Sequence, residues 1–167
     1  MLSNLIIRKT TSADLPAIVE LWKELMDFHR NLDPFFSRSK NGHESFLKWI
    51  QKGIESDSTE IFVADYSGKI QGYILIEISN YPPVFELKKY GMISDAAVSI
   101  DYRGKGIGET LYKRSMEWFA KKGIERVELR VANVNSVAKG FWKKMGSIPY
   151  MTTMFKERNT DGASNNF

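Results

Sequence analysis

Residues 103–108 read Arg-Gly-Lys-Gly-Ile-Gly, so glycine occupies every second position and two positions carry cations. The run follows an apolar, strand-like segment, residues 92–100, and precedes an amphipathic segment that begins at Ile107. Glycine lets the backbone approach a ligand without Cβ clashes, and the free N–H groups of a first helical turn bind anions. Arg103 and Lys105 add positive charge at the same place. The run is therefore a candidate binding loop for a pyrophosphate.

Two common nucleotide-binding loops fit this spacing poorly. A Walker A loop needs a hydroxyl residue directly after Gly-Lys, but Lys105 is followed by Gly106 and Ile107. A dinucleotide fingerprint needs G-x-G-x-x-G early in the chain, whereas Gly104, Gly106 and Gly108 are evenly spaced and come late. The remaining alternative is an ordinary strand-to-helix turn, which seldom needs three glycines flanked by two cations.

The pattern Arg103-x-x-Gly106-x-Gly108 resembles the pyrophosphate loop of the GNAT N-acetyltransferase superfamily, written there as Gln/Arg-x-x-Gly-x-Gly/Ala. A later pattern, Asn135-x-x-Ala138-x-x-Phe141-Trp142-x-x-x-Gly146, is similar to the second motif of that family, a helix beside the pantetheine arm. Residues 93–98 stand where the family has the strand that lines its cofactor. With residues 6–18 similar to the opening strand and helix, the resemblance covers about residues 4–156.

The resemblance implies an enzyme that uses acetyl-CoA as co-substrate. The acetyl group passes directly to a primary amine, of a small molecule or a protein, in a ternary complex without a covalent enzyme intermediate. The absence of cysteine is consistent with this route. The implied cofactor-binding residues are Ala97, Val98, Arg103, Gly104, Lys105, Gly106, Ile107, Gly108, Asn135, Ala138 and Trp142.

Individual roles follow from the chemistry that the cofactor requires. Backbone N–H groups of residues 105–108, aided by Arg103, would hold the pyrophosphate. A strand whose ladder is broken near Val98 would offer free N–H and C=O groups to the pantetheine and polarise the thioester carbonyl. Asn135 either bonds the pantetheine or caps the following helix, and both roles are compatible.

The residue that protonates the departing thiolate is not fixed by the motif. Many relatives carry tyrosine where this chain has Trp142, and an indole N–H cannot supply a proton at neutral pH. The replacements are Tyr112, Tyr150 or water. Tyr150 is preferred as catalytic acid because it opens the strand expected after that helix.

The general base is also open, because Ser94 stands where some relatives have glutamate. Asp95, Glu77 or a water chain could take the proton, and Asp95 is favoured as the catalytic residue. The alternative for Asp95 is a polar residue that bonds nearby backbone. His29 could face the acceptor opening, although a histidine at a helix C-terminus more often interacts with the helix dipole.

Composition bounds the class of protein. The 167 residues suit one domain, placed at residues 1–158, and the polar tail 159–167 is expected to be disordered. The net charge of +4 comes from 24 basic and 20 acidic residues spread along the chain, which argues against a nucleic-acid partner. Without an apolar run of about 18 residues or a signal-peptide pattern, we expect a cytoplasmic protein with no membrane partner. No cysteine and two histidines argue against a metal site.

Periodicity and turn residues predict the elements that must position these residues. The expected fold class is α+β, with a mixed, mostly antiparallel sheet flanked by helices on both faces, which is also the fold of the family. The expected strands are residues 4–9, 60–66, 69–79, 91–100, 125–131 and about 150–155. The first expected helix begins near Ser12, and the other three span residues 43–54, 107–122 and 135–145.

Three functions are weighed: an acetyl-CoA-dependent N-acetyltransferase, a catalytically degenerate acyl-CoA sensor, and an unrelated phosphate-binding domain. Loops 33–42 and 80–90 would border the acceptor, and their aromatic and acidic residues suggest a cationic one without identifying it. Dimers are common among relatives, and Met154 or Phe155 on the expected last strand could join a homodimer.

Overall fold

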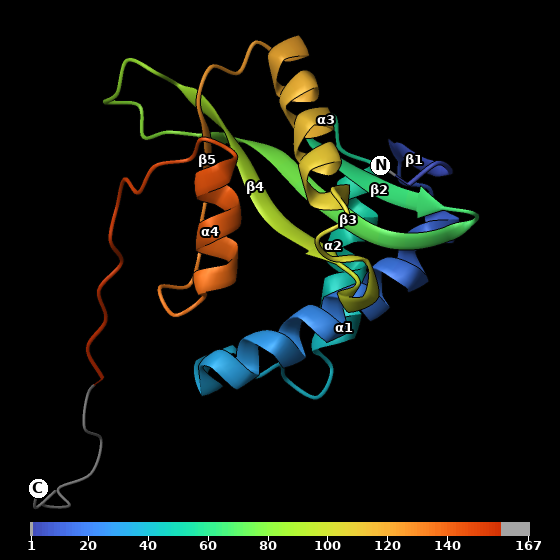
Figure 1. The fold of residues 1–167 in the computed structure, drawn as a ribbon. Helices are drawn as coiled ribbons and strands as arrows, with labels where there is room; N and C mark the ends of the chain where they lie inside the picture. Colours follow the sequence, from blue (N-terminus) through green and yellow to red (C-terminus); the bar gives the residue numbers. More distant parts are fainter. Residues whose placement is uncertain (1, 158–167) are drawn as a thin grey trace, which may run out of the picture.

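The sheet is built from strands that pair in the order in which they occur in the chain. A computed structural model describes residues 2–157, and the predicted tail 159–167 lies outside them. Figure 1 shows the five strands: β1 (Leu5–Lys9), β2 (Thr59–Tyr66), β3 (Lys69–Asn80), β4 (Lys89–Val98) and β5 (Val127–Leu129). The first four are antiparallel neighbours, and β5 lies parallel to β4. The mixed, mostly antiparallel sheet predicted from the sequence is confirmed.

The helices lie close to the ranges predicted from the sequence. They are α1 (Leu15–Leu32), α2 (Gly42–Ile54), α3 (Ile107–Lys121) and α4 (Ser136–Lys144), with short 3-10 turns η1 (Ser12–Asp14), η2 (Pro34–Phe36) and η3 (Ile100–Tyr102). Asp33 ends α1 in an extended conformation before Pro34. Gly123, at φ 69°, follows the end of α3 as a left-handed residue.

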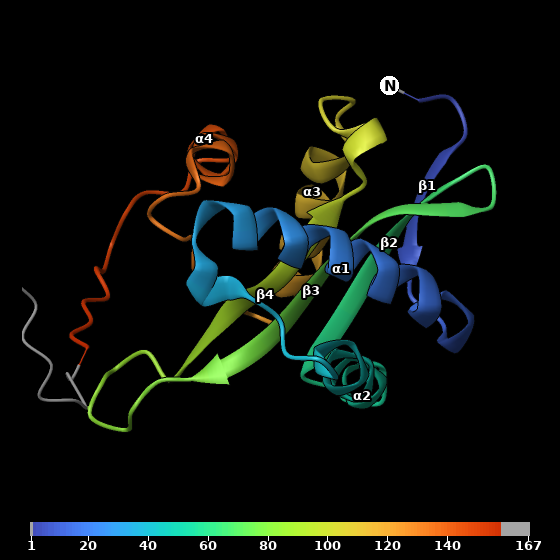
Figure 2. The ribbon, with the colours of Figure 1, turned by 90° about the horizontal axis from the view of Figure 1, so that it is seen from below.

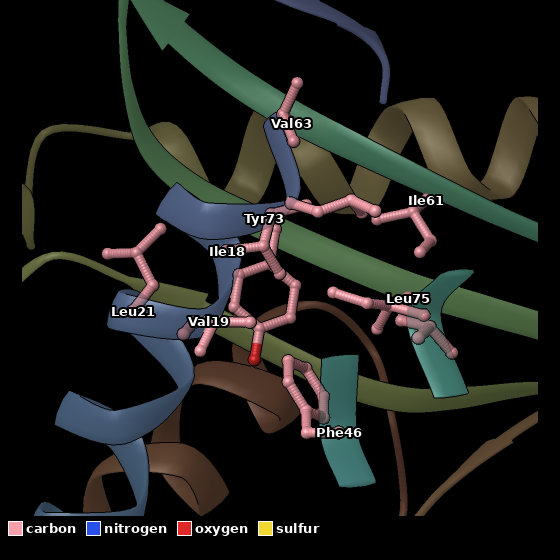
Figure 3. Close-up of a cluster of buried hydrophobic side chains, with 11 residues drawn as sticks. Ile18, Val19, Leu21, Phe46, Ile61, Val63, Tyr73 and Leu75 are labelled. Carbon is pink, nitrogen blue, oxygen red and sulfur yellow. The ribbon is translucent and has the colours of Figure 1, made fainter. Parts of the chain in front are cut away.

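Alternation along the central strands fills a core on each face of the sheet. Inward residues on one face pack against α1 and α2, as Figure 3 shows for Ile61, Val63, Tyr73 and Leu75. Their sequence neighbours, including Phe62 and Ile74, pack against α3 on the opposite face. Each fully buried apolar side chain of this kind stabilises the fold by about 1.5–3 kcal/mol. Helices therefore cover both faces, with α1 and α3 on opposite sides (Figure 2).

A bulge in β4 decides the shape of the sheet near the site. Leu75 pairs with Asp95 while Ile76 pairs with Ile93, so Ser94 is the extra residue. Pairing between β4 and β5 ends at Ile93 and Leu129. Within the described residues, the stretch 94–98 has no strand beside it on the β5 side.

The predicted last strand, residues 150–155, is wrong: no strand follows α4 within the described chain. Residues 147–157 have no regular structure, and Tyr150, Met154 and Phe155 are exposed. The expected strand 125–131 is also shorter, because β4 turns away after three pairs and leaves β5 only three residues long. Such a short edge offers little for a further strand to pair with.

Gly91 tests the packing of β4 on α3, because a Cβ atom there would lie 2.4 Å from the Phe119 ring. We expect Gly91→Ala to lower the free energy of unfolding by about 1–3 kcal/mol, through overpacking. The matched control is Gly140→Ala in α4, where nothing lies within 4 Å of the added atom. That change should stabilise by up to about 1 kcal/mol through helix propensity. Urea midpoints measure both, and an unchanged midpoint for Gly91→Ala would contradict this packing.

Candidate functional site

A cleft of about 340 Å³ lies where β4 leaves β5, between the end of α1, the start of α3 and α4. Its size is in the range of small-molecule sites. All the predicted cofactor-binding residues except Lys105 line it: Ala97, Val98, Arg103, Gly104, Gly106, Ile107, Gly108, Asn135, Ala138 and Trp142. The lining residues that the sequence did not single out as cofactor contacts include Leu25, Phe28, Tyr73, Glu109 and Val137.

The glycine-rich loop ends as an open helix start facing this cleft. Gly104 and Gly106 have φ angles of 73° and 86°, and nothing lies within 4 Å of a Cβ atom added at either. Glycine is therefore needed there for the backbone conformation and not for space. The helical ladder starts with the N–H of Thr110 donating to Gly106 O at 3.1 Å. The N–H groups of residues 107–109 precede that first bond, so the ladder leaves them free for an anion.

A glycine also allows α3 and α4 to approach each other closely. A Cβ atom on Gly108 would lie 3.3 Å from the Phe141 ring, so the missing side chain lets the two helices meet. Next to it, Trp142 packs edge-on against Tyr112 at 6.0 Å between ring centroids. The Tyr112 hydroxyl donates to Met145 O at 3.3 Å. These contacts form the wall of the cleft on the α4 side.

Arg103 is turned back towards α1. Its Nε donates to Val98 O at 3.0 Å, and its guanidinium lies 3.4 Å from the Glu24 carboxylate and 5.4 Å from the Phe28 ring centroid. Glu24 also accepts from the N–H of Ile100 at 2.8 Å. In this conformation Arg103 joins α1 to the end of β4, in addition to lining the cleft. The Glu24 carboxylate partly neutralises the positive charge of Arg103.

The open edge of β4 lies beside this loop. The N–H of Ser99 donates to Gln71 O at 2.9 Å, towards β3. Because the direction of backbone groups alternates along a strand, the N–H and C=O of Val98 point to the opposite edge, where the C=O accepts from Arg103 Nε. The break in the ladder that was predicted near Val98 lies earlier, since pairing with β5 already ends at Ile93.

Asp95 and Tyr73 form a buried pair next to the cleft. The Tyr73 hydroxyl donates to Asp95 Oδ2 at 3.0 Å, and Tyr73, which is fully buried, lines the cleft. Burial raises the pKa of the Asp95 carboxyl to about 6, against the hydrogen bond from Tyr73, which lowers it. Burial and the nearby carboxylate raise the pKa of Tyr73 well above its usual 10. At neutral pH, Asp95 is therefore a carboxylate close to its titration, with a protonated Tyr73.

Ser94 and Glu77 bond to each other near the bulge. The Ser94 hydroxyl donates to Glu77 Oε1 at 2.6 Å. Glu77, the alternative base considered above, is thus engaged with β4 and is not among the residues that line the cleft.

Asn135 is buried, with 4% of its surface exposed, and it makes two side-chain contacts. Its Oδ1 accepts from the N–H of Ala138 at 3.0 Å, which caps α4 as predicted, and its Nδ2 lies 3.1 Å from His29 Nε2. Burial lowers the pKa of His29 below its usual 6.5. The lowered pKa disfavours the charged ring that a strong interaction with the helix dipole needs.

Comparison with known proteins agrees with this geometry. Residues 18–147 match the model of the Acetyltransferase (GNAT) family. The chain belongs to the GNAT family.

Two archaeal relatives are named uncharacterized N-acetyltransferases. The one from Methanocaldococcus jannaschii is 30% identical over 140 residues, which are 84% of this chain but only 59% of that protein. The one from Archaeoglobus fulgidus is 27% identical over 136 residues, covering 81% of this chain and 88% of that protein. These names support acetyltransferase chemistry at the level of the family.

Solved structures share the fold. A mutant of the BH1408 protein from Bacillus halodurans superimposes with a TM-score of 0.81 at 24% identity, over 92% of this chain and 99% of that one. The aminoglycoside N-acetyltransferase AAC(6')-Iy, solved in complex with CoA, gives a TM-score of 0.71 at 16% identity, over 93% of this chain and 95% of that one. The GNAT fold predicted from the sequence is confirmed.

In this GNAT chain, the two predicted catalytic residues lie in different surroundings. Asp95 is joined to the cleft through Tyr73, whereas Tyr150 is 69% exposed and is not among the lining residues. The Arg126 guanidinium lies 4.2 Å from the Tyr150 ring centroid, beside Glu128 on β5. Tyr150 stays outside the cleft because the strand expected to carry it does not form.

The described part of this GNAT chain has neither a metal cluster nor a membrane helix. In residues 2–157, no three histidine or carboxylate side chains gather where they could hold a metal ion. No helix in the same residues combines the length and apolar character that a membrane crossing needs.

The raised pKa of Asp95 gives a stability prediction. An acid whose pKa is raised on folding contributes stability at low pH and loses it as pH rises through the folded pKa, here between about 4 and about 6. We expect the stability of Asp95→Asn relative to wild type to be greater at pH 7.5 than at pH 4, by at most about 3 kcal/mol. Urea unfolding at the two pH values measures this difference. Tyr73→Phe keeps the Asp95 carboxyl but removes its hydrogen-bond donor. In ¹³C NMR, this variant should titrate the Asp95 carboxyl at a higher midpoint than wild type. A wild-type midpoint near 4 would contradict the raised pKa of Asp95.

Proposed function

We propose that this chain transfers an acetyl group from acetyl-CoA to a primary amine by direct attack in a ternary complex. The observation that carries the proposal is the cleft at the open edge of β4, with a glycine-rich helix start at its border. AAC(6')-Iy, which has the same fold, was solved with CoA and with a bisubstrate analog, CoA-S-monomethyl-acetylneamine. Bound acetyl-CoA would supply an acetyl group already activated as a thioester.

The residues at the helix start fit a diphosphate. The N–H groups of residues 107–109 lie before the first helical bond, and the positive end of the α3 dipole favours an anion there. Gly104 and Gly106 leave the approach free of side chains. We assign the pyrophosphate to these backbone groups, with added positive charge from Lys105, whose ammonium lies 4.5 Å from the Tyr102 ring centroid.

The open edge of β4 fits the pantetheine arm and the thioester. The N–H of Val98 points away from β3, so it is available to polarise a carbonyl oxygen on which negative charge develops. Ala138 and Trp142 on α4 form the opposite wall. Asn135 caps the first turn of α4, which carries Ala138.

We assign the proton of the attacking ammonium to the Tyr73–Asp95 pair. Tyr73 lines the cleft and its hydroxyl already donates to Asp95 Oδ2, so this oxygen would accept a proton from the amine while its own proton passes to the carboxylate. The neutral amine then attacks the thioester carbon, the C–N bond forms and the C–S bond breaks. Because the Tyr112 hydroxyl bonds Met145 and Tyr150 lies outside the cleft, we assign to water the relay of the second nitrogen proton, released as the amide forms, to the departing thiolate.

The acceptor is a primary amine whose identity requires a screen. Relatives of this chain are named for different acceptors: streptothricin for a Bacillus subtilis protein, and the alanine of ribosomal protein bS18 for a putative one from the same organism. A panel should therefore contain streptothricin, an aminoglycoside, a polyamine and an alanyl peptide, with thiol release as the readout. If acetyl-CoA binds and no amine increases thiol release, the degenerate sensor considered in the sequence analysis becomes the better assignment.

A charge reversal in the loop tests the cofactor site. Gly106→Glu places a carboxylate at the helix start, and we expect it to weaken acetyl-CoA binding at least about 100-fold in isothermal titration, through charge repulsion and loss of the left-handed glycine. Gly68→Glu is the matched control, because Gly68 also has a positive φ, 82°, with nothing within 4 Å, but lies in the distant β2–β3 turn. Equal acetyl-CoA affinities for the two variants would contradict the assignment of residues 103–108 to the pyrophosphate.

The proton pathway predicts a pH dependence of catalysis. In wild type, kcat/KM should fall as pH drops through about 6, where the Asp95 carboxylate becomes protonated and can no longer accept a proton. Asp95→Asn should lower kcat roughly 100-fold and leave the dissociation constant of acetyl-CoA unchanged. Steady-state kinetics with the best amine of the panel measures this. An Asp95→Asn enzyme with wild-type kcat would exclude Asp95 as the base.

A further inference from the structure

The contact between His29 and Asn135 joins two elements that line different walls of the cleft. His29 lies in the last turn of α1, and Asn135 is the N-cap of α4, 106 residues later. Figures 1 and 2 both place the end of α1 next to the start of α4. Phe28, the neighbour of His29, lines the cleft from α1, while Val137 and Ala138 line it from α4. The contact therefore links the α1 wall of the cleft to the α4 wall.

The bonding of Asn135 leaves it one orientation. Its Oδ1 is used by the N–H of Ala138, so the amide cannot turn around without losing the cap. Its Nδ2 then needs an acceptor, because a buried donor without a partner is costly. His29 Nε2, at 3.1 Å, supplies that acceptor if the ring proton is on Nδ1, as this bonding pattern assigns. The tilted rings of Phe28 and Phe36, with centroids 5.8 and 5.5 Å from that of His29, hold the imidazole in place.

The first turn of α4 depends on this bond more than a well-packed helix would. None of the residues 136–144 is buried, whereas Asn135, directly before them, is. The far end of α4 is held to α3 through Phe141 against Gly108 and through Tyr112 against Met145. The near end carries the cleft-lining Val137 and Ala138.

We propose that His29 is a positioning residue for the acyl-CoA site: by accepting the hydrogen bond of Asn135, it holds the start of α4 against α1 and so sets the width of the cleft. This role rests on the proposed function. His29 does not touch the reacting atoms in this role. It acts through Asn135, and its effect should appear in cofactor affinity more than in the chemical step.

Two substitutions of His29 separate the acceptor from the ring. His29→Phe keeps an aromatic ring between Phe28 and Phe36 but removes the acceptor nitrogen. His29→Gln removes the ring but supplies an amide oxygen that can accept from Asn135. We expect the dissociation constant of acetyl-CoA to rise about 10-fold in His29→Phe and to stay within about 3-fold of wild type in His29→Gln, with kcat at saturating acetyl-CoA little changed in both. A purely structural role for the ring predicts the reverse order.

A double-mutant cycle tests whether the two residues act together. Asn135→Ser keeps a good N-cap but is too short to reach His29. The double variant His29→Phe/Asn135→Ser should bind acetyl-CoA about as weakly as the weaker single variant, because both changes remove the same bond. Affinity losses that simply add would overturn the proposal.

Hydrogen exchange of the ligand-free protein gives a readout that needs no cofactor. We expect the amides of residues 137–140 to exchange faster in His29→Phe than in His29→Gln, with α3 amides unchanged. Equal exchange and equal affinity in the two variants would overturn the positioning role while leaving the proposed function intact. Wild-type protein that does not bind acetyl-CoA would overturn both, even with the expected exchange pattern.

Discussion

The parting of β4 from β5 is the constraint on which the site depends. Ser94 is an extra residue in β4, and the parallel pairing ends one position before it. A bulge bends its strand and disrupts the ladder, so the stretch 94–98 leaves β5 with one backbone edge unpaired. That edge, the start of α3 and the wall of α4 together enclose the cleft. A fully paired sheet would have closed it.

Much of the candidate site consists of backbone groups. The helix start of α3 and the open edge of β4 present N–H and C=O groups, and the glycines at 104, 106 and 108 control conformation and approach. Backbone groups do not specify which amine is bound, so they are compatible with relatives named for different acceptors. Under the proposed function, selectivity for the amine falls to side chains, and Leu25 and Phe28 line the α1 side of the cleft.

Burial changes the acid–base properties of the groups around the cleft in two directions. It raises the pKa of Asp95 to about 6 and lowers that of His29, because in each case the charged form is harder to solvate. The pKa of the Asp95 carboxyl thereby moves closer to neutral pH, and the His29 imidazole stays uncharged as an acceptor for Asn135. The same physical effect thus supports a proton-transfer role for one residue and a positioning role for the other.

The sequence by itself determined the features that depend on neighbours in the chain. The loop 103–108, the end of α1 before Pro34 and the cap at Asn135 follow from local backbone preferences, and ten of the eleven cofactor-binding residues implied by the family motifs line the cleft. Only the tertiary structure decided the pairing of Tyr73 with Asp95, 22 residues apart, and of His29 with Asn135, 106 residues apart. Those bonds depend on strand register and on how helices pack across the sheet, which no local pattern contains. For the same reason the apolar residues 150–155 read as a strand, although β5 is too short to provide a long edge for one.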